Sequence, residues 1–289
     1  MSYISTLDSR LQKLRSIILD YGQMIIALSG GVDSVFLLAF AAKVFEESYG
    51  PGSDRIAALT ASGPHFAPDE VEYAVHLCSM LGISHKTVRA EDVLELIEDN
   101  PQDRCYICKK SIFSQLKERA DMVGSVLADG TNLDDMDDYR PGYRALQELG
   151  VSSPLKDAGL TKSEIRCALK QLAADDAVLE SALILQDGTP VWHKPAFACL
   201  ASRIPYGEKI TADKLDAIYR AEVFMRSLGF SQVRVRHHGD VARIEVLPED
   251  RHKLYDDALM DRVNEEIRAC GFSYAALDLG GYRMGNLNR

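Results

Sequence analysis

The sequence predicts an α/β protein with a Rossmann-like (HUP-type) parallel sheet and a smaller α+β domain at the C-terminal end. Residues 24–28 are a short continuous apolar run, which is typical of a strand buried on both faces of a sheet, and residues 56–60 predict a second buried strand. Strands alternate with helical patterns over the first ~170 residues, which indicates a parallel sheet covered by helices on both faces. After residue 207 this alternation is replaced by a short α+β pattern.

The elements are expected in a definite order. Domain 1–206 holds helices at 7–21, 35–45 and 71–81 and strands at 24–28, 56–60, 85–88 and 125–128. Domain 207–289 holds helices at 214–228 and 254–267, strands at 233–236 and 241–246, and a closing apolar segment at 274–279. His238-Gly239-Asp240 predicts a tight hairpin turn between the two strands, and its flanking histidines are expected to be solvated.

Composition excludes several classes of function. The chain has 289 residues, 46% of them hydrophobic, and a net charge of -10 without a basic stripe, so nucleic acid is not an expected partner. No apolar run approaches the ~20 residues of a membrane helix, and no signal-peptide core is present at the start. We therefore expect a cytoplasmic protein in which the six cysteines are thiols, metal ligands or catalytic groups.

The run Ser29-Gly30-Gly31-Val32-Asp33-Ser34 stands between a strand and a helix and predicts a phosphate loop of the ATP pyrophosphatase type. The two glycines let the backbone approach an anion closely. Ser29, Ser34 and the free amides that open the helix can then bind phosphate oxygens of ATP. Asp33 suits a bound Mg²⁺, and the lysine of a Walker loop is absent. The alternative is an ordinary glycine-bearing turn.

Further ATP-binding residues are expected where other strands end, since ligands bind at the carboxyl ends of strands in open α/β sheets. These residues are Thr60 and Ser62 after the second strand and Gly130 and Thr131 after a later one. An acidic stretch follows, with oxygen ligands that suit Mg²⁺ but also with the character of a solvated loop: Asp134, Asp135, Asp137 and Asp138.

Three cysteines stand out. Cys105 and Cys108 form a Cys-x-x-Cys pair, which can be redox-active, zinc-binding or two thiols at a helix start. Cys199 lies in a loop between prolines, where Arg203 can stabilise its thiolate as a nucleophile. Three thiolates suit a [4Fe-4S] cluster with one open iron. We expect no role for Cys78, Cys167 or Cys270.

These segments together resemble the LarE family of ATP-dependent sulfur transferases, over nearly the whole chain. The matching blocks are Ser29-Gly30-Gly31-Val32-Asp33-Ser34, Asn100-Pro101-Gln102-Asp103-Arg104-Cys105, Asp129-Gly130-Thr131-Asn132, Asp138-Tyr139-Arg140-Pro141-Gly142, Lys194-Pro195 with Ala198-Cys199-Leu200-Ala201-Ser202-Arg203-Ile204-Pro205-Tyr206-Gly207, and Gly281-Tyr282-Arg283. The block around Cys199 is the more specific signal, because many ATP pyrophosphatases share the phosphate loop.

The resemblance implies a reaction in the synthesis of the nickel-pincer nucleotide of lactate racemase. ATP adenylates a carboxylate of pyridinium-3,5-biscarboxylic acid mononucleotide, and sulfur then replaces AMP. In one branch of the family the cysteine matching Cys199 gives up its own sulfur, and in another three cysteines hold a [4Fe-4S] cluster that carries exogenous sulfide. Because this chain has Cys105 and Cys108 as well, the cluster branch is favoured.

The resemblance also implies homo-oligomers, a sulfide or sulfur donor, and a downstream nickel-inserting enzyme. We expect Arg234, Arg236 and Arg283 to bind the phosphate and carboxylate of the substrate, although exposed surface charges are the alternative. Glu222 is expected as an acidic partner close to Cys199. The chain departs from the family in its long 173–191 stretch and in His193.

Three rival functions remain. A transfer-RNA thiolase should carry zinc-binding cysteines or a basic surface, and neither is present. An amide-forming ligase such as NAD synthetase would leave the three cysteines unexplained. A nucleotide sensor would bind ATP without releasing pyrophosphate.

Overall fold

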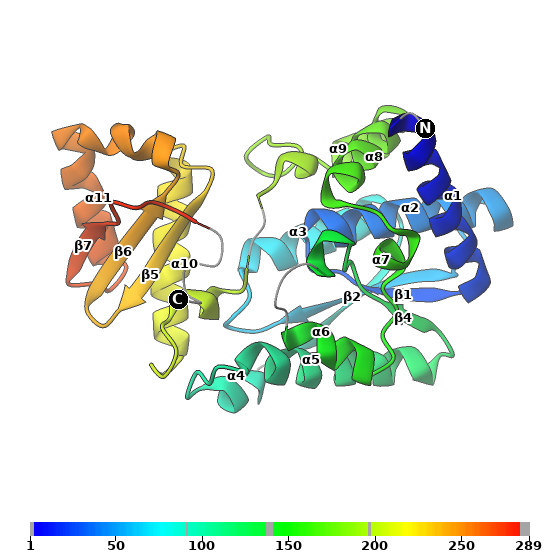
Figure 1. Cartoon of the computed structure of the whole chain (residues 1–289), viewed down its shortest axis with the longest axis horizontal. Helices are drawn as coiled ribbons and strands as arrows, with labels where there is room; N and C mark the ends of the chain where they lie inside the picture. The colour runs from blue at the N-terminus through cyan, green and yellow to red at the C-terminus, as the bar shows by residue number, and fades with distance from the viewer. Residues whose placement is uncertain (1–2, 91, 137–140, 196–197, 284–289) are drawn as a thin grey trace. The chain divides into compact units, whose positions relative to one another are not determined.

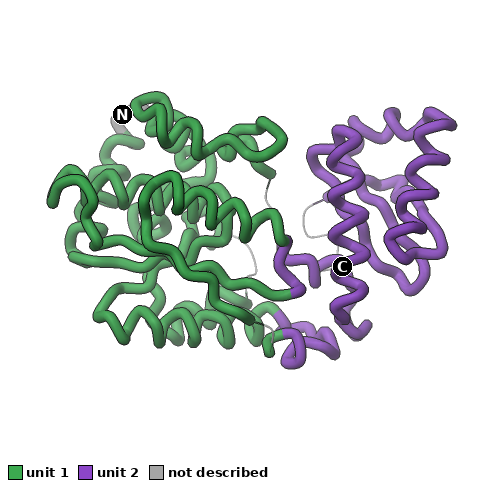
Figure 2. Tube along the Cα trace, turned by 180° about the vertical axis from the view of Figure 1, so that it is seen from behind, with its two compact units in different colours: residues 1–63, 68–93, 105–196 green, residues 64–67, 94–104, 197–289 purple. Residues whose placement is uncertain are grey.

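A computed structural model describes residues 3–90, 92–136, 141–195 and 198–283 of the chain. Two compact units are present (Figure 2), and each is described by itself. The first comprises residues 1–63, 68–93 and 105–196, and the second comprises residues 64–67, 94–104 and 197–289. The second unit thus includes two short segments from the first half of the chain, and the domain boundary expected at residue 207 stays a prediction.

A four-stranded parallel sheet forms the centre of the first unit, in the order β3-β2-β1-β4. Its strands are β1 (Met24–Ala27), β2 (Ile56–Ser62), β3 (Ser84–Arg89) and β4 (Val126–Ala128). The apolar run that predicted β1 pairs with both neighbours, since Met24 lies opposite Ile56 on one side and Val126 on the other. The chain moves outward from β1 to β3 and then returns to β4, so the direction of the strand order reverses beside β1.

Helices cover both faces of this sheet, as the sequence predicts: α1, α2, α3 and α8 lie on one side and α5 and α6 on the other (Figure 1). The helices of this unit are α1 (Tyr3–Tyr21), α2 (Val32–Tyr49), α3 (Pro68–Met80), α5 (Arg104–Met122), α6 (Pro141–Glu148), α7 (Pro154–Ala158), α8 (Lys162–Ala174) and α9 (Ala177–Ala182), with the 3-10 helices η1 (Asp134–Met136) and η2 (Val191–His193). Phe36 and Phe45 on α2 are fully buried, and each stabilises the unit by roughly 1.5–3 kcal/mol.

The long 173–191 stretch packs against this core. It forms α9 and an isolated bridge between Ile184 and Pro190. Leu179, Leu183 and Val191 are buried with the apolar side chains of the first unit. The stretch is therefore an integral part of the first unit, which the sequence does not reveal.

The second unit is a small α+β structure with a mixed three-stranded sheet in the order β5-β6-β7. Its elements are η3 (Leu200–Arg203), α10 (Ala212–Ser227), β5 (Val233–His238), β6 (Val241–Val246), η4 (Pro248–Tyr255), α11 (Asp257–Ala269) and β7 (Tyr274–Leu277); α4 (Asp92–Ile97) lies where the chain passes from the first unit to the second. β5 and β6 are antiparallel, and β7 pairs parallel with β6.

The turn predicted at residues 238–240 is confirmed. His238 pairs with Val241, and Gly239 adopts a φ of 57°, a conformation that favours glycine in two-residue hairpins. The expectation that both histidines are solvated is wrong, because His237 and His238 are half-buried and burial lowers the pKa of each. Within the described residues, no helix has both the length and the apolar character needed to cross a membrane.

Candidate active site

The phosphate loop joins β1 to α2 and is held by its own serines. Ser34 Oγ donates to the carbonyl of Gly31 at 3.0 Å, and the amide of Ser29 donates to Ser34 Oγ at 3.3 Å. Gly30 has a φ of 75°, which turns the backbone sharply before α2. The amides of the first turn of α2 therefore open at the carboxyl end of β1, where the helix dipole favours an anion.

Gly130 lies at the same end of the sheet, in the loop that follows β4. A Cβ on Gly130 would lie 2.7 Å from the amide nitrogen of Ser34, so only glycine permits the loop after β4 to pass beside the first turn of α2. β1 and β4 flank the point at which the strand order reverses, which is the usual place of a ligand in an open α/β sheet.

One carboxylate oxygen of Asp33 has no hydrogen-bond partner among the described residues at this loop. Its Oδ2 accepts a hydrogen bond from Lys162 Nζ, whereas Oδ1 is buried and has no hydrogen-bond partner among the described residues. Burial raises the pKa of Asp33, and the negative charge of Asp135 acts in the same direction, while Lys162 opposes the shift. An orphaned carboxylate oxygen beside phosphate-binding amides fits a Mg²⁺ ion.

Lys162 is a site residue that sequence reasoning missed. It is the first residue of α8, and the preceding Thr161 forms a capping box with Glu164. A lysine in the first turn of a helix is unfavourable for the helix dipole. That unusual placement is the signal in the sequence that points to an acidic partner.

The remaining predicted ATP-binding residues have structural contacts of their own. Thr60 Oγ1 donates to the carbonyl of Leu28 at 2.8 Å and lies 2.8 Å from His85 Nε2. Thr131 Oγ1 donates to Asp129, so both hydroxyls already have partners. Ser62 is half-exposed at the end of β2. The structure thus leaves the hydroxyl of Ser62 more accessible than those of the two threonines.

Two residues of the acidic stretch act as hydrogen-bond acceptors. Asp134 accepts from the amide of Lys162 at 2.8 Å, and Asp135 accepts from the amide of Asn132 at 3.1 Å. Asp137 and Asp138 lie outside the described residues. Asp134 therefore caps the start of α8, and its proposed contact with Mg²⁺ stays a prediction.

In the second unit, Arg203 organises the loop that carries Cys199. Its guanidinium is fully buried and pairs with both carboxylate oxygens of Glu222, at 2.8 and 2.9 Å. The same guanidinium donates to the carbonyls of Ala198 and Cys199, at 2.6 and 3.1 Å. Glu222 also accepts from the amide of Val235 at 3.0 Å. Both predicted residues therefore fix the backbone around Cys199, whose thiol is half-buried.

The two strand arginines are buried and not surface charges. Arg236 donates to Glu245 at 2.9 Å and to the carbonyl of Ser202 at 2.9 Å, which links β5 to the Cys199 loop. Arg234 donates to the carbonyl of Val233. Burial and repulsion by Arg203 lower the pKa of Arg234 to about 10. A guanidinium buried among other guanidinium groups is stabilised when a phosphate or carboxylate binds.

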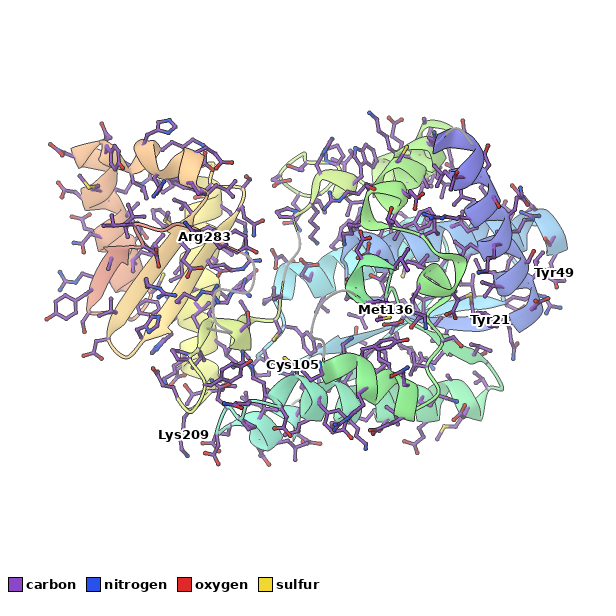
Figure 3. The ribbon with its side chains drawn as sticks, viewed as in Figure 1. Tyr21, Tyr49, Cys105, Met136, Lys209 and Arg283 are labelled. Atoms are coloured by element: carbon purple, nitrogen blue, oxygen red, sulfur yellow. The ribbon has the colours of Figure 1, made fainter. Side chains whose placement is uncertain are left out.

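Arg283 lies near the end of the described chain and is exposed (Figure 3). The ring of the preceding Tyr282 stacks 5.2 Å from the Arg234 guanidinium, so the Gly281-Tyr282-Arg283 block lies beside the buried arginines.

Cys105 and Cys108 occupy the first turn of α5, three residues apart, and Figure 3 marks Cys105 at this helix start. All six cysteines are thiols and not disulfides. In the described part of the chain, no three His, Cys, Asp or Glu side chains are arranged to hold a metal ion. Cys105 and Cys108 lie in the first unit and Cys199 in the second, so the fit of an iron–sulfur cluster rests on the chemistry of the three thiols.

A buried network precedes Cys105. Asn100 is fully buried with a φ of 51°, and its Nδ2 donates to the carbonyls of Ile204 and Pro205 at 3.1 and 2.6 Å. Arg104, also buried, donates to Asn100 Oδ1 and stacks 4.5 Å from the ring of Tyr206. The segment that leads into Cys105 is thus bonded to the segment that follows Cys199. The sequence placed both residues in a block that matches the family but gave them no role, because their partners are about a hundred positions away.

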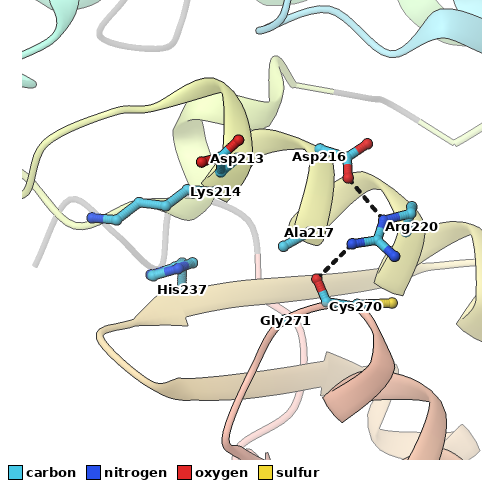
Figure 4. A pocket seen from close by; sticks show the side chains of 8 residues that line it. All are labelled: Asp213, Lys214, Asp216, Ala217, Arg220, His237, Cys270 and Gly271. Atoms are coloured by element: carbon cyan, nitrogen blue, oxygen red, sulfur yellow. Dashed lines mark hydrogen bonds and ion pairs between the residues drawn. The ribbon is translucent and has the colours of Figure 1, made fainter.

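A cavity of about 350 Å³ also lies in the second unit, between α10, β5 and the end of α11 (Figure 4). Arg220 spans one side of it by donating to Asp216 and to the carbonyl of Cys270, both at 2.8 Å. None of the predicted site residues lines this cavity.

Comparison with known proteins agrees with the fold. Residues 7–126 match the family model of NAD synthase. The structure resembles glutamine-dependent NAD+ synthetase from Acinetobacter baumannii, solved with ADP, with a TM-score of 0.51 and 17% identity over 94% of this chain. The chain covers 46% of that structure, and at this identity the likeness shows the fold alone.

Two relatives match over full length. The protein slr1717 of Synechocystis sp. is 38% identical over 98% of both chains. Pyridinium-3,5-bisthiocarboxylic acid mononucleotide synthase of Lactiplantibacillus plantarum is 35% identical over 99% of this chain and 96% of its own.

The sheet, the phosphate loop and these matches define an enzyme of the PP-loop ATP pyrophosphatase class. Within that class, the chain belongs to the LarE family, the family of the Lactiplantibacillus synthase.

Proposed function

We propose that this enzyme is an ATP-dependent sulfur transferase acting on pyridinium-3,5-biscarboxylic acid mononucleotide in nickel-pincer nucleotide synthesis. The observation that carries the proposal is the presence, in one chain, of a phosphate loop with an orphaned Asp33 oxygen and a cysteine loop fixed by Arg203 and Glu222. The full-length match to the Lactiplantibacillus synthase supports this choice of substrate.

In the first step, a carboxylate oxygen of the substrate attacks the α-phosphorus of ATP, and pyrophosphate leaves. The amides of the first turn of α2, with Ser29 and Ser34, bind the phosphates. Asp33 would hold Mg²⁺, which supplies charge neutralisation for the phosphates. Thr60, Ser62, Gly130 and Thr131 complete the proposed ATP site. Their contacts in the structure imply that Thr60, Gly130 and Thr131 shape the site more than they bind through side chains.

In the second step, sulfur attacks the acyl carbon and AMP leaves, which yields a thiocarboxylate. Arg234, Arg236 and Arg283 are the proposed anchors for the substrate's phosphate and second carboxylate. Arg234 fits this role because burial and the charge of Arg203 disfavour its own positive charge and lower its pKa, so an anion beside it is favourable. Arg236 also pairs with Glu245, and it holds the Cys199 loop through the carbonyl of Ser202 in addition to its proposed contact with the substrate.

The sulfur source is proposed to be a [4Fe-4S] cluster held by Cys105, Cys108 and Cys199. When bound, the cluster would supply an open iron that carries sulfide from an external sulfur donor. The bonded residues before Cys105 and after Cys199 support this proposal, because hydrogen bonds join Asn100 to the carbonyls of Ile204 and Pro205. Homo-oligomers, a cytoplasmic location and transfer of the product to a nickel-inserting enzyme stay predictions.

The alternative sulfur source is Cys199 itself. Its Sγ would attack the acyl adenylate, and AMP would leave to give a thioester. Loss of the Cys199 α-proton and cleavage of its Cβ–Sγ bond would then release the thiocarboxylate and leave dehydroalanine. Each chain would react once, and its mass would fall by one H₂S.

The deciding experiment is to purify the protein without oxygen and to measure iron and sulfide for wild type, Cys105→Ala and Cys167→Ala. About four irons per chain in wild type and in Cys167→Ala, lost in Cys105→Ala, are expected. If wild type contains no iron even after anaerobic reconstitution, the cluster is excluded. Cys199 then remains as the sulfur donor, and each chain reacts once. Pyrophosphate release that does not depend on the added dicarboxylate would exclude the transferase itself.

Amide formation is the second candidate, because residues 7–126 match the NAD synthase family model. An amide-forming enzyme would release pyrophosphate with ammonium and a nicotinate dinucleotide as substrates. The expected result is no release with that pair, and a release comparable to that with the pyridinium dicarboxylate would favour the ligase.

A further inference from the structure

The phosphate loop has no basic residue of its own, although the triphosphate that it is proposed to bind carries several negative charges. Residues 29–34 contain a carboxylate, Asp33, and no lysine or arginine. Cations must therefore reach the loop from other elements. Lys162 from α8 is one, through Asp33. Lys194, which follows η2, is a second.

Lys194 touches the loop directly. Its Nζ donates to the carbonyl of Gly30 at 3.0 Å and to Glu70 Oε2 at 2.6 Å. The side chains of Lys194 and Glu70 are each only 15% exposed. The ammonium group therefore sits at the sharp turn of the loop, held in a partly buried position.

Glu70 places a negative charge beside the phosphate loop. It lies in the first turn of α3, and its Oε2 stands 2.7 Å from the point where a Cβ on Gly30 would lie. A carboxylate this close to a phosphate loop would repel ATP if its charge were not compensated. Lys194 supplies that compensation and brings a donor to the same place.

The ammonium group has donor capacity to spare. It carries three N–H donors, and the described residues provide hydrogen-bond acceptors for two of them, Gly30 and Glu70, while the ring of Tyr73 lies 5.2 Å from Nζ. The backbone behind it is fixed, because Arg166 on α8 donates to the carbonyl of Lys194 at 2.7 Å. A rigidly mounted lysine with one remaining N–H is suited to bind a phosphate oxygen.

We propose that Lys194 is a phosphate-binding residue of the ATP site, held at the loop by Glu70 until the β- and γ-phosphates arrive. The inference rests on the proposed function, since it requires polyphosphate at this loop. It specifies the part of the nucleotide that Lys194 recognises, which is the pyrophosphate portion and not the AMP portion.

The test measures equilibrium binding of ATP, inorganic pyrophosphate and AMP with Mg²⁺ to wild type, Lys194→Met, Lys194→Arg, Glu70→Gln and the double variant Glu70→Gln/Lys194→Met. Lys170→Met is the matched control, because Lys170 is an exposed lysine on α8. Lys194→Met is expected to weaken ATP and pyrophosphate binding by about tenfold or more, with AMP binding changed by less than about threefold. Lys194→Arg keeps part of the affinity, and Lys170→Met keeps all of it.

The double variant separates a phosphate contact from mere charge compensation. If Lys194 binds phosphate, the double variant binds pyrophosphate about tenfold or more weakly than Glu70→Gln, because the contact is lost in a background where Glu70 no longer repels the phosphates. Recovery of wild-type affinity in the double variant would overturn the inference, because Lys194 would then only neutralise Glu70. Equal losses for AMP and pyrophosphate in Lys194→Met would overturn it as well, since they would indicate a general defect of the fold.

The two proposals fail in different ways. If wild type binds neither ATP nor pyrophosphate, both the proposed function of this loop and the inference about Lys194 are excluded. If wild type binds both and Lys194→Met binds pyrophosphate equally well, only the inference about Lys194 falls.

Discussion

Gly130 lets the loop after β4 pass against the first turn of α2, where a Cβ would stand 2.7 Å from the Ser34 amide nitrogen. Both partners are backbone, so neither can move away cheaply. Gly130→Ala is expected to lower the free energy of unfolding by roughly 1–3 kcal/mol, measured by urea denaturation. The same substitution at Gly31, where φ is -78° and the nearest atom is Ser29 Oγ at 3.4 Å, should change it by less than about 1 kcal/mol. Equal effects at the two glycines would contradict the steric argument.

Arg203 and Glu222 are both fully buried, so each needs the other. Removal of Glu222 by Glu222→Leu leaves an unpaired buried guanidinium and is expected to cost roughly 3–5 kcal/mol of unfolding free energy. Arg203→Met/Glu222→Leu removes both charges and should be more stable than Glu222→Leu alone. Denaturant unfolding of the two single variants and the double variant measures this coupling. Additive losses would show that the two side chains act independently.

Among elements, the segment 98–104 depends on a partner that is distant in sequence. Asn100 donates to the carbonyls of Ile204 and Pro205, and its own carbonyl accepts from the amide of Gly207 at 3.1 Å. Asn100→Ala removes the side-chain bonds, so the amides of Gly207 and Ile210 are expected to exchange hydrogen about tenfold faster or more. Hydrogen-exchange mass spectrometry measures this, with peptides from β6 as the internal control. Unchanged exchange at residues 207–210 would show that the network does not stabilise this segment.

Elements with a local sequence signal could be predicted, and those that depend on distant partners could not. β1 is an uninterrupted apolar run, β2 begins with one, and the hairpin turn needs Gly239, so their signals lie within a few residues. The 173–191 stretch forms an element only by packing its apolar side chains on the first unit. Its sequence alone therefore shows that the stretch is long but does not show which elements it forms.

The residues of the candidate site also differ in whether the sequence could predict them. The phosphate loop is one contiguous run, and the sequence suffices to locate it. Lys162 and Lys194 reach the loop from 129 and 164 residues away, and no spacing rule connects such positions. The sequence identifies the two arginines of β5 as candidate site residues. Whether they are buried or exposed depends on packing against η3 and β6, which the sequence does not show.

For the whole molecule, a net charge of -10 opposes binding of a long polyanion, which bears on the transfer-RNA thiolase alternative. Bulk transfer RNA at about 0.15 M salt is expected to show no saturable binding and no effect on pyrophosphate release. Filter binding and a pyrophosphate assay with and without RNA measure the two quantities. Stimulation of pyrophosphate release by RNA would revive the thiolase alternative.

Folding stability should also depend on pH through His65, which is fully buried in the second unit and packs 4.2 Å from the Phe66 ring. Burial lowers the pKa of His65 to about 4. Below pH ~6.5 the unfolded chain binds a proton at this residue that the folded chain does not bind until about pH 4, so stability falls with pH across that window.

The His65 contribution to this loss is about 2 kcal/mol between pH 7 and pH 5. Burial lowers the pKa of His85, His237 and His238 as well, so wild type should lose more than this in total. His65→Phe isolates the single contribution, because it removes the titrating ring and keeps an aromatic side chain beside Phe66. Urea unfolding at both pH values should therefore show a smaller loss for His65→Phe than for wild type. His76→Asn, at an exposed position on α3, should lose as much as wild type. If His65→Phe and wild type lose stability equally, then His65 is not held neutral by burial, and the pH dependence arises from other titrating groups.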